Sequence, residues 1–388
     1  MKTDILIVGS GCSGLYAVLN LPEELDIMLI TKSDFESSDS FLAQGGMCTL
    51  KDPSDYDSFF EDTLKAGHYE NDHGSVEIMI KSSPDIVKDL VKYGVSFIRD
   101  ENGDFVYTRE GAHAHHRILF HEDITGREIT SHLLDAVKKL KNVRMYEYTT
   151  LLDILCDGSK CCGGIIRWPD GREEPVEADY VILATGGIGG TYKHSTNFKH
   201  LTGDGVEIAR RHNIELKNLD YVQIHPTTLY SDNEEERSFL ISESVRGEGA
   251  RLYDKNMNRF VDELLPRDLL TQEIYKQMEK DGTDFVWEDL RTIPHDELIN
   301  HFPNIIEHCS QAGYDVFHEC IPIVPAQHYF MGGIKVNHNS KTSMDHLYAV
   351  GETACNGVHG KNRLASNSLL ESLVFAKRAA KEIADERR

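Results

Sequence analysis

The chain lacks the residue patterns that would indicate a metal centre, a nucleic-acid partner or attachment to an anionic membrane. Its eight cysteines include no Cys-x-x-Cys pair and no Cys/His spacing typical of zinc or of an iron–sulfur cluster. It has no block of basic residues, and its formal net charge of −23 would repel a phosphate backbone. We therefore expect reduced thiols, no metal ligands, no nucleic acid and no membrane partner.

Long apolar runs and internal repeats are also absent. No apolar run approaches the length of a bilayer span, and Met1 leads within four residues into an apolar strand, which leaves no room for a signal peptide. The 388 residues, 40% of them hydrophobic and 27% charged, have the composition of a globular protein with room for two domains. These features predict a cytoplasmic protein.

Three stretches each have the pattern of a buried strand that ends in a glycine or acidic turn. They span residues 4–14, 181–187 and 347–352. The three glycines of the first stretch allow a tight turn, close approach of a pyrophosphate, and a helix whose N-terminal N–H groups face the phosphates. Together the stretches predict one dinucleotide site that is assembled from both ends of the chain.

The remaining segments predict an α/β fold in two parts. Residues 54–93 and 125–141 have helical periodicity. After about residue 225 the pattern changes to charged helices with short connectors, and it returns to the first type near residue 331. We expect a Rossmann-like dinucleotide-binding domain formed by residues 1–225 and 331–388, with an inserted α+β capping domain of residues 226–330.

The end of the second strand bears on the identity of the dinucleotide. A domain that holds NAD through its ribose carries an acid there, about 20 residues after the glycines. This chain has Leu29-Ile-Thr-Lys-Ser33 instead, which favours a flavin dinucleotide over NAD. Glu352, at the end of the third strand, could supply the missing sugar contact.

A run of capping residues precedes the last predicted helix. Ser366, Asn367 and Ser368 form a good N-cap run ahead of Leu369. The positive end of this helix could stabilise the negative charge that builds on the pyrimidine edge of a flavin during its reduction. The same pattern also fits a purely structural role, a capped amphipathic helix that packs on the core. The two roles are compatible.

Seven ordered motifs cover nearly the whole chain and carry a family resemblance. The motifs are Ser40-x-x-x-Gln44-Gly-Gly46, Arg109-Glu-Gly-Ala-His-Ala-His-His-Arg117, Gln223-Ile-His-Pro-Thr227, Arg246-Gly-Glu-Gly-Ala250, Pro266-Arg-Asp268, Gln327-His-Tyr-Phe-Met-Gly-Gly333 and Gly360-Lys-Asn-Arg-Leu-Ala-Ser-Asn-Ser-Leu369. In this order they resemble the flavoprotein family of fumarate reductase, succinate dehydrogenase and L-aspartate oxidase. The histidine-rich second motif is most similar to L-aspartate oxidase. The resemblance implies FAD-dependent oxidation of L-aspartate to iminoaspartate, with hydride transfer to flavin N5, for quinolinate and NAD synthesis.

The resemblance assigns a carboxylate-binding role to residues in several of these motifs. His225, His328 and Arg363 would bind the carboxylates of the substrate, L-aspartate or another C4-dicarboxylate. Ser242 and Glu243 match a hydroxyl–acid pair that lines the carboxylate site, although this chain has serine where the family pattern has threonine. The hydroxyl is retained, so we count this as a mild departure.

Three further residues have roles implied by the same resemblance. Arg267 corresponds to the proton-shuttling arginine, and with His225 and His328 it makes up the expected catalytic set. Gln223 would orient the substrate or the flavin. Glu110 would pair with the ammonium group of L-aspartate, which succinate and fumarate do not have.

We expect FAD to contact all three strand-and-turn units and the glutamine motif. The expected contacts are Gly9, Ser10, Gly11, Gly14, Thr31, Lys32, Ser40, Gln44, Gly45, Gly46, Ala184, Gly186, Gly187, Asp204, Glu352, Ser368 and Leu369. Covalent flavin attachment in the membrane-bound relatives uses a histidine five positions before the glutamine of Gln-Gly-Gly. Because Asp39 stands at that position, the FAD should be noncovalent.

Two other functions stay open at this point. A soluble fumarate reductase or succinate oxidase on the same scaffold would act on a substrate without an ammonium group, which an unpaired Glu110 would repel. A flavin-binding electron-transfer or regulatory module would have no use for so many cationic motifs. The sequence also leaves open whether the hydride leaves Cα or Cβ, whether O2 or fumarate accepts the electrons, and the oligomeric state.

The chain departs from the resemblance at its C-terminus. Typical L-aspartate oxidases continue past the closing flavin helix with a helical domain, whereas this sequence ends at Arg388. We therefore expect a short form without that domain. Quinolinate synthase is the candidate protein partner, and the missing domain makes that contact unsafe to infer.

Overall fold

The computed structural model describes residues 1–233 and 236–387, and within them the largest sheet has seven strands. Its order is β5-β2-β1-β8-β7-β6, with β15 also paired to β8. The pairs among β5, β2, β1, β8 and β15 are parallel, and those among β8, β7 and β6 are antiparallel. These strands are β1 (Lys2–Val8), β2 (Ile27–Ile30), β5 (Val143–Tyr146), β6 (Thr150–Asp157), β7 (Lys160–Arg167), β8 (Glu173–Leu183) and β15 (Leu347–Ala349).

The parallel part of this sheet brings the three predicted strand-and-turn units together. Val8 of β1 is in register with Leu183 of β8, and Leu183 is in register with Ala349 of β15. The carboxyl ends of strands from the start, middle and end of the chain therefore meet at one edge. Ligands of open α/β sheets bind outside this edge. The prediction of a site assembled from both ends of the chain agrees with this arrangement.

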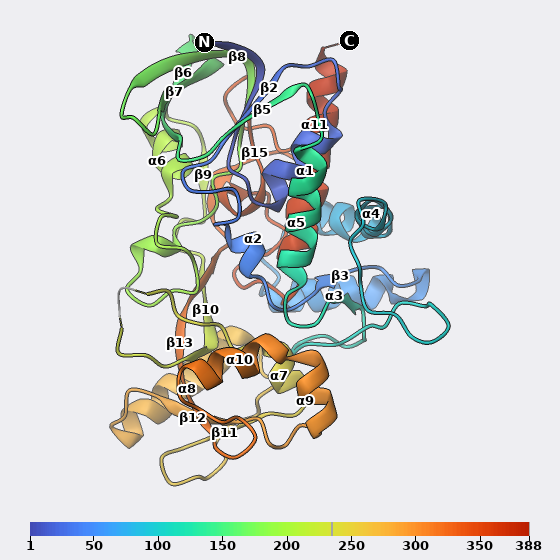
Figure 1. The fold of residues 1–388 in the computed structure, drawn as a ribbon, viewed down its shortest axis with the longest axis vertical. Coiled ribbons are helices and arrows are strands. Elements are labelled where there is room, and N and C mark those ends of the chain that lie inside the picture. Colours follow the sequence, from blue (N-terminus) through green and yellow to red (C-terminus); the bar gives the residue numbers. More distant parts are fainter. Residues whose placement is uncertain (234–235, 388) are drawn as a thin grey trace.

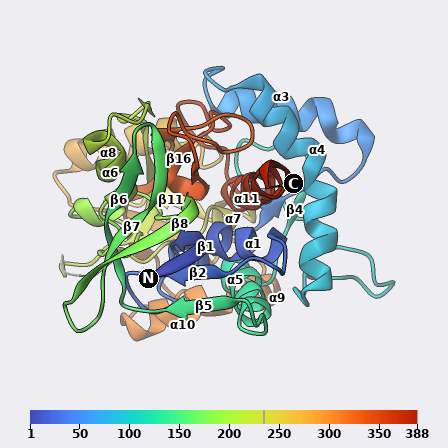
Figure 2. The same ribbon diagram turned by 90° about the horizontal axis from the view of Figure 1, so that it is seen from above.

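Helices cover both faces of the parallel strands, which explains why β2 and the buried second half of β1 are apolar. One apolar cluster joins the sheet to α1, α4, α5 and α11, and a second lies on the face that carries α6 (Figure 2). These helices are α1 (Cys12–Asn20), α4 (His73–Lys92), α5 (Thr125–Val137), α6 (Asp204–Arg211) and α11 (Ser368–Glu386).

The predicted helix over residues 54–93 is two helices. A short 3-10 turn, η1 (Pro53–Asp55), leads into α3 (Tyr56–Ala66), and α4 begins at His73. The break has a local cause, because His68 and Tyr69 adopt positive φ angles of 57° and 58° after Gly67. Asp72 then caps α4 by accepting a hydrogen bond from the N–H of Ser75 at 2.8 Å.

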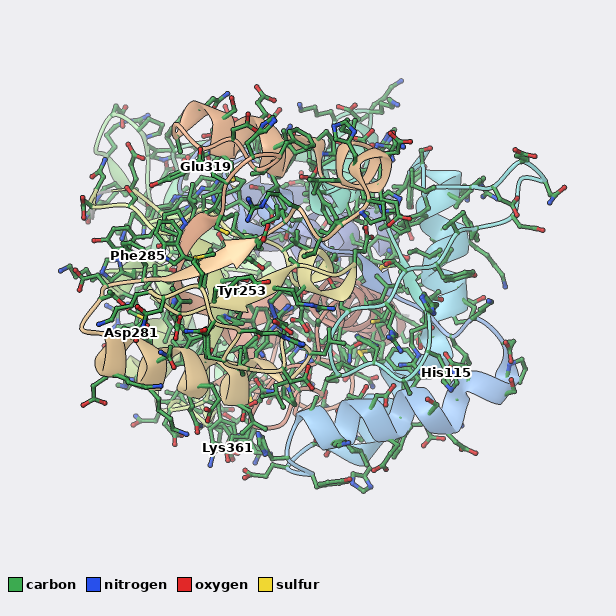
Figure 3. The ribbon with its side chains drawn as sticks, turned by 90° about the horizontal axis from the view of Figure 1, so that it is seen from below. His115, Tyr253, Asp281, Phe285, Glu319 and Lys361 are labelled. Atoms are coloured by element: carbon green, nitrogen blue, oxygen red, sulfur yellow. The ribbon has the colours of Figure 1, made fainter. Side chains whose placement is uncertain are left out.

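The lower part of the molecule in Figure 1 has its own sheet and its own apolar core. The core residues lie between Leu229 and Ile323. Seen from below (Figure 3), Tyr253 of β11 lies near the centre of this part and Asp281 marks the end of α8. The sheet order is β10-β13-β12-β11, and the elements are β10 (Val222–Leu229), α7 (Glu243–Gly247), β11 (Arg251–Tyr253), α8 (Arg267–Asp281), β12 (Val286–Asp289), α9 (His295–His301), α10 (Pro303–Gln311) and β13 (Ile321–Phe330).

Several short elements lie outside the two main sheets. They are α2 (Asp39–Leu42), β3 (Met47–Cys48) paired with β4 (Ile118–Leu119), η2 (Gly189–Thr191), η3 (Gly351–Thr353), and a sheet of β9 (Leu216–Lys217), β14 (Gly333–Lys335) and β16 (Ala354–Cys355). The predicted fold class, a Rossmann-like domain from both termini with an inserted α+β domain, is confirmed. The exact boundaries at residues 226 and 330 stay a prediction, and Arg388 lies outside the described residues.

The predicted N-cap run before α11 is wrong in its detail. Asn367 is the N-cap residue, but its side chain makes no capping hydrogen bond and instead donates to Thr63 Oγ1 at 3.2 Å. Ser366 has a φ of 60° and donates its hydroxyl to Glu110 Oε2. The polar side chains point away from the helix end because neighbouring buried groups bind them.

Membrane crossing can be judged from the helices themselves. In residues 1–233 and 236–387, no helix combines the length and the apolar character that a bilayer span requires.

A buried ion cluster holds the histidine-rich segment against α3. Arg117 is fully buried, and its guanidinium group binds both carboxylate oxygens of Asp55 at 2.8 Å and Asp62 at 2.6 Å. His113 Nδ1 lies 3.1 Å from the same group, whereas His115 of this segment is exposed (Figure 3).

We expect Arg117→Met to lower the free energy of unfolding by roughly 3–5 kcal/mol, because it leaves two carboxylates in a buried site without their cation. Urea unfolding of the FAD-saturated protein measures this. Arg167→Met is the control, since Arg167 and Glu173 are about half exposed and their ion pair should contribute under about 1 kcal/mol. An equal loss in both variants would contradict the role of the buried cluster.

Candidate functional site

A long cleft runs between the sheet edge and the lower part of the molecule, and most of the predicted site residues line it. These are Gly9, Ser10, Gly11, Thr31, Lys32, Ser40, Gln44, Gly45, Gly46, Glu110, Ala184, Gly186, Asp204, His225, Ser242, Glu243, Arg267, His328, Glu352, Arg363, Ser368 and Leu369. Gly14, Gly187 and Gln223 lie behind the wall of the cleft. The residues of the predicted cofactor and substrate sets thus share one continuous space.

The glycines of the first turn create the narrow end of the cleft. Gly9 has a φ of 116°, and a Cβ there would lie 2.0 Å from the carbonyl oxygen of Ala184. A Cβ on Gly14 would lie 2.0 Å from the carbonyl oxygen of Gly9, so this glycine allows α1 to pack on the turn. Gly11 is the N-cap of α1 and has no capping side chain of its own. The N-terminus of α1 therefore faces the cleft as an anion-binding end.

Polar groups along the same wall fit a dinucleotide such as FAD. Ser38 Oγ, Asp39 Oδ2 and Gln44 Oε1 are buried and have no hydrogen-bond partner within the described residues, although all three residues line the cleft. Buried polar atoms are rarely left unpaired in proteins. A cofactor rich in donors and acceptors would satisfy them, which supports the fit of FAD.

Lys32 and Asp204 bind each other at the far end of the cleft. Lys32 Nζ lies 2.8 Å from Asp204 Oδ2 and donates to the carbonyl of His200 at 2.9 Å. Thr31 is also engaged, because its hydroxyl lies 3.2 Å from that of Ser10. These contacts join the end of β2 to the start of α6 and close the end of the site.

Four basic side chains gather at the opposite end of the cleft. Arg267, at the start of α8, and Arg363 are both buried, and Gln223 Oε1 accepts from Arg267 Nη1 at 2.9 Å and from Arg363 Nε at 3.3 Å. The rings of His225 and His328 are 5.0 Å apart. Gln223 is therefore a residue that positions the two arginines, and it does not itself line the cleft.

The two histidines are held neutral by their surroundings. Burial, together with Arg267, lowers the pKa of His225, and burial with Arg363 lowers the pKa of His328. His225 Nδ1 lies 3.2 Å from the N–H of Thr227 and 3.0 Å from its carbonyl oxygen, so this nitrogen contacts the backbone in either tautomer of the neutral ring. The other ring nitrogen, Nε2, is buried without a partner among the described residues. A group bound in the cleft could therefore form a hydrogen bond with Nε2.

Two carboxyl groups, Glu243 and Glu110, lie beside this basic cluster, and their pKa values shift in opposite directions. Glu243 Oε2 accepts from Arg267 Nε at 2.6 Å, and although burial would raise its pKa, Arg267 and Arg246 bring it below the usual value. Burial and the neighbouring Glu243 raise the pKa of Glu110. Glu110 accepts hydrogen bonds from Ser244 at 2.8 Å and Ser366 at 2.5 Å. Glu243 is the ionised member, and Glu110 is the one that takes up a proton first.

Sequence reasoning missed several residues that line the cleft. The guanidinium carbon of Arg363 lies 4.2 Å from the ring centroid of Tyr329, and the ring of His359 packs edge-on against Tyr329 at 5.3 Å. Tyr329 follows His328 in the motif of residues 327–333, and this adjacency was the sequence signal that could have indicated its place in the cleft. Asn197 and Arg237 lie in loops without any pattern, and no sequence signal could have found them.

Comparison with known proteins gives one consistent result. A family model described as an FAD binding domain matches residues 4–369. The chain is 51% identical to the L-aspartate oxidase of Clostridium perfringens, over 98% of this chain and 86% of that protein. It is 45% identical to the L-aspartate oxidase of Clostridium acetobutylicum, over 99% of this chain and 88% of that one. The structure of a point variant of E. coli quinol fumarate reductase FrdA superposes with a TM-score of 0.93 and 29% identity, covering 99% of this chain and 70% of that one.

Glu352 gives the cofactor end of the cleft a testable pH dependence. Burial and the neighbouring Asp39 raise the pKa of Glu352 to about 8. Ribose hydroxyls donate to a carboxylate, so FAD should bind the ionised form and its affinity should rise with pH up to about 8, by at most about ten-fold per unit, and then level off. Fluorescence titration of the apoprotein with FAD from pH 6 to 9 measures this. Glu352→Gln should give a flat profile, and an equally flat profile for the parent protein would refute the contact.

Proposed function

The chain belongs to the L-aspartate oxidase family of FAD-binding proteins, and on that premise we propose that it oxidises L-aspartate to iminoaspartate with FAD as its cofactor. The product would supply quinolinate and NAD synthesis. The observation that carries this proposal is a basic cluster suited to two carboxylates with one acid, Glu110, beside it.

FAD would be held by the glycine turn of β1, the N-termini of α1 and α11, and Glu352. When bound, it supplies an acceptor for the hydride that leaves the substrate. We propose noncovalent binding, because Asp39 occupies the position of the attachment histidine and accepts from the N–H of Phe198 at 3.0 Å. The eight cysteines are all free, which supports a reducing compartment such as the cytoplasm.

The basic cluster would bind the two carboxylates of the substrate at separate points. Arg363 offers a guanidinium group that has no acidic partner within 4 Å in the described residues. His225 offers its unpaired Nε2, which would donate to a carboxylate in the Nε2–H tautomer, and Ser242 and His328 line the same space. Because these groups come from both parts of the fold, they fix the position of the substrate carbons between them.

Glu110 would select the aminated substrate. Its two oxygens are fixed by the hydroxyls of Ser244 and Ser366, and a Cβ on Gly45 would lie only 2.6 Å from Oε1. An ammonium group beside this carboxyl favours its ionised form and forms a buried ion pair with it. Succinate leaves the carboxyl unpaired, so the site favours L-aspartate.

Arg267 would take the proton that leaves the substrate carbon. Its Nε and Nη1 are bound to Glu243 and Gln223, whereas Nη2 has no hydrogen bond among the described residues. Nη2 can accept that proton when Arg267 is in its neutral form with the imine at Nη2, while its Nε–H stays donated to Glu243 at 2.6 Å. Arg246 Nη2 lies 4.0 Å from Glu243 and helps to keep that carboxylate ionised.

The proposal also covers the electron acceptor and the protein partner. O2 and fumarate both remain compatible with the cleft, and a soluble fumarate reductase is the second candidate function because of the close structural match to fumarate reductase. Quinolinate synthase is the proposed partner, because it consumes the reactive imine product.

Glu110→Gln should raise KM for L-aspartate by roughly ten- to a hundred-fold, because it removes a charge from a buried ion pair. Binding of succinate should be unchanged or tighter. Anaerobic bleaching of the flavin by each substrate measures both, with Glu101→Gln at an exposed turn as the control. If succinate or fumarate turns over and L-aspartate does not, the fumarate reductase alternative is correct. If no substrate bleaches the flavin, and Arg363→Leu changes nothing, the protein is a flavin-binding module.

Tyr329→Leu should weaken binding of dicarboxylates by about ten-fold, because the ring face that stabilises the buried Arg363 cation is lost. Tyr329→Phe keeps that face and should stay within about two-fold of the parent protein. The dissociation constant of succinate, from the perturbation of the flavin spectrum, is the measurement, and the FAD content checks that the cofactor site is intact. Equal losses in the two variants would assign the effect to the hydroxyl instead.

A further inference from the structure

A second group of reactive side chains lies outside the cleft, at the end of β6 away from it. Cys156 Sγ lies 3.5 Å from His212 Nδ1, and His212 Nε2 lies 2.7 Å from Asp153 Oδ1. Cys156 is exposed, and the side chains of His212 and Asp153 retain 25% and 34% of their accessible area. A small solute can therefore reach the thiol directly.

The backbone of β6 is irregular at the two positions that build this group. Residues three apart on a regular strand point to opposite faces of the sheet. The register of β6 on β7 shifts between Leu151 and Asp153 and again between Leu155 and Cys156. Bulges of this kind redirect side chains. They allow Asp153 and Cys156 to contact the same imidazole, which follows the last turn of α6.

The contacts define the proton positions of a nucleophile, a base and an orienting acid. Asp153 accepts the Nε2–H of His212, and Nδ1 is then the lone-pair nitrogen that faces the thiol. No group of three or more His, Cys, Asp and Glu residues in the described chain is arranged to hold a metal ion. The arrangement is therefore suited to thiol chemistry.

The thiol needs this base. Burial, Cys162 and Asp153 raise the pKa of Cys156, so the thiolate does not form by itself at neutral pH. A thiolate of higher pKa is, however, the stronger nucleophile once its proton has been removed. His212 is in place to remove that proton during the reaction.

We propose that Cys156, with His212 as general base and Asp153 as its orienting group, is a modification site for peroxides. The sulfur attacks one peroxide oxygen, so that an S–O bond forms as the O–O bond breaks. The thiol proton passes to His212 Nδ1 and then to the departing oxygen, which leaves as water when the reagent is hydrogen peroxide. The sulfur loses two electrons to the peroxide and becomes a sulfenic acid.

Cys320 provides a matched thiol in the same chain. It is partly exposed, and burial and Asp289 raise its pKa as well. Its sulfur contacts Arg291 Nη2 at 3.5 Å and no histidine within the described contacts. Because Cys156 is the more exposed of the two, the decisive comparison is the rate of Cys156 with and without His212.

The test uses the full chain with FAD bound and a Cys162→Ser background, so that the neighbouring thiol cannot consume the sulfenic acid. The protein is treated with limiting hydrogen peroxide and dimedone, and each cysteine is quantified by peptide mass spectrometry. Cys156 should be labelled at least about ten-fold faster than Cys320. His212→Gln should bring Cys156 to the rate of Cys320, and Asp153→Asn should give an intermediate rate.

Equal labelling of Cys156 and Cys320, or an unchanged rate in His212→Gln, would overturn the proposal. FAD absorbance and melting temperature verify that each variant is folded. Cys156→Ser should retain FAD and L-aspartate turnover, because the site lies outside the cleft lining. The proposal for Cys156 and the proposed oxidation of L-aspartate can therefore be refuted independently of each other.

Discussion

Two buried guanidinium groups share one acceptor atom, and the chemistry of the cleft depends on that contact. Gln223 Oε1 holds Arg267 and Arg363 together although they repel each other, and burial with Arg267 lowers the pKa of Arg363 to about 10. Glu243 pairs with Arg267 and lies near Arg246, but not near enough to Arg363 to form an ion pair. Arg363 is therefore left without an acidic partner within 4 Å among the described residues, and a carboxylate bound in the cleft would supply one.

The fold makes this arrangement by combining two sheets with different tasks. The parallel sheet ends in turns whose glycines remove side-chain bulk at the cofactor end. The β10-β13 pair supplies Gln223, His225, His328 and Tyr329, and its register shifts at Gln223/Ile224 and at His225/Thr228. A regular ladder would send neighbours such as His328 and Tyr329 to opposite faces, whereas both line the cleft here.

The sequence predicted what depends on local pattern. The apolar strands that end in glycine turns predicted the edge of the sheet where the cleft lies. The order of the motifs predicted the basic residues of the cleft. It did not predict partners chosen by tertiary packing. Asn367 has an ideal capping side chain, yet Thr63 binds it. The contact of Lys32 with FAD stays a prediction, whereas its ion pair with Asp204 had no signal in the sequence. Arg237 lines the cleft from a loop without sequence periodicity, so only the folded structure reveals its position.

The residues proposed to bind the substrate belong to two parts of the fold with separate apolar cores. His225 lies on β10 and Arg267 begins α8, whereas Arg363 precedes α11 and Glu110 accepts hydrogen bonds from Ser366 before α11 and from Ser244 of α7. A four-carbon diacid bound at both ends, as proposed, would therefore crosslink these two parts. The tighter this crosslink, the less the two parts can rock against each other, so occupancy of the site should register as mechanical stiffening of the whole molecule.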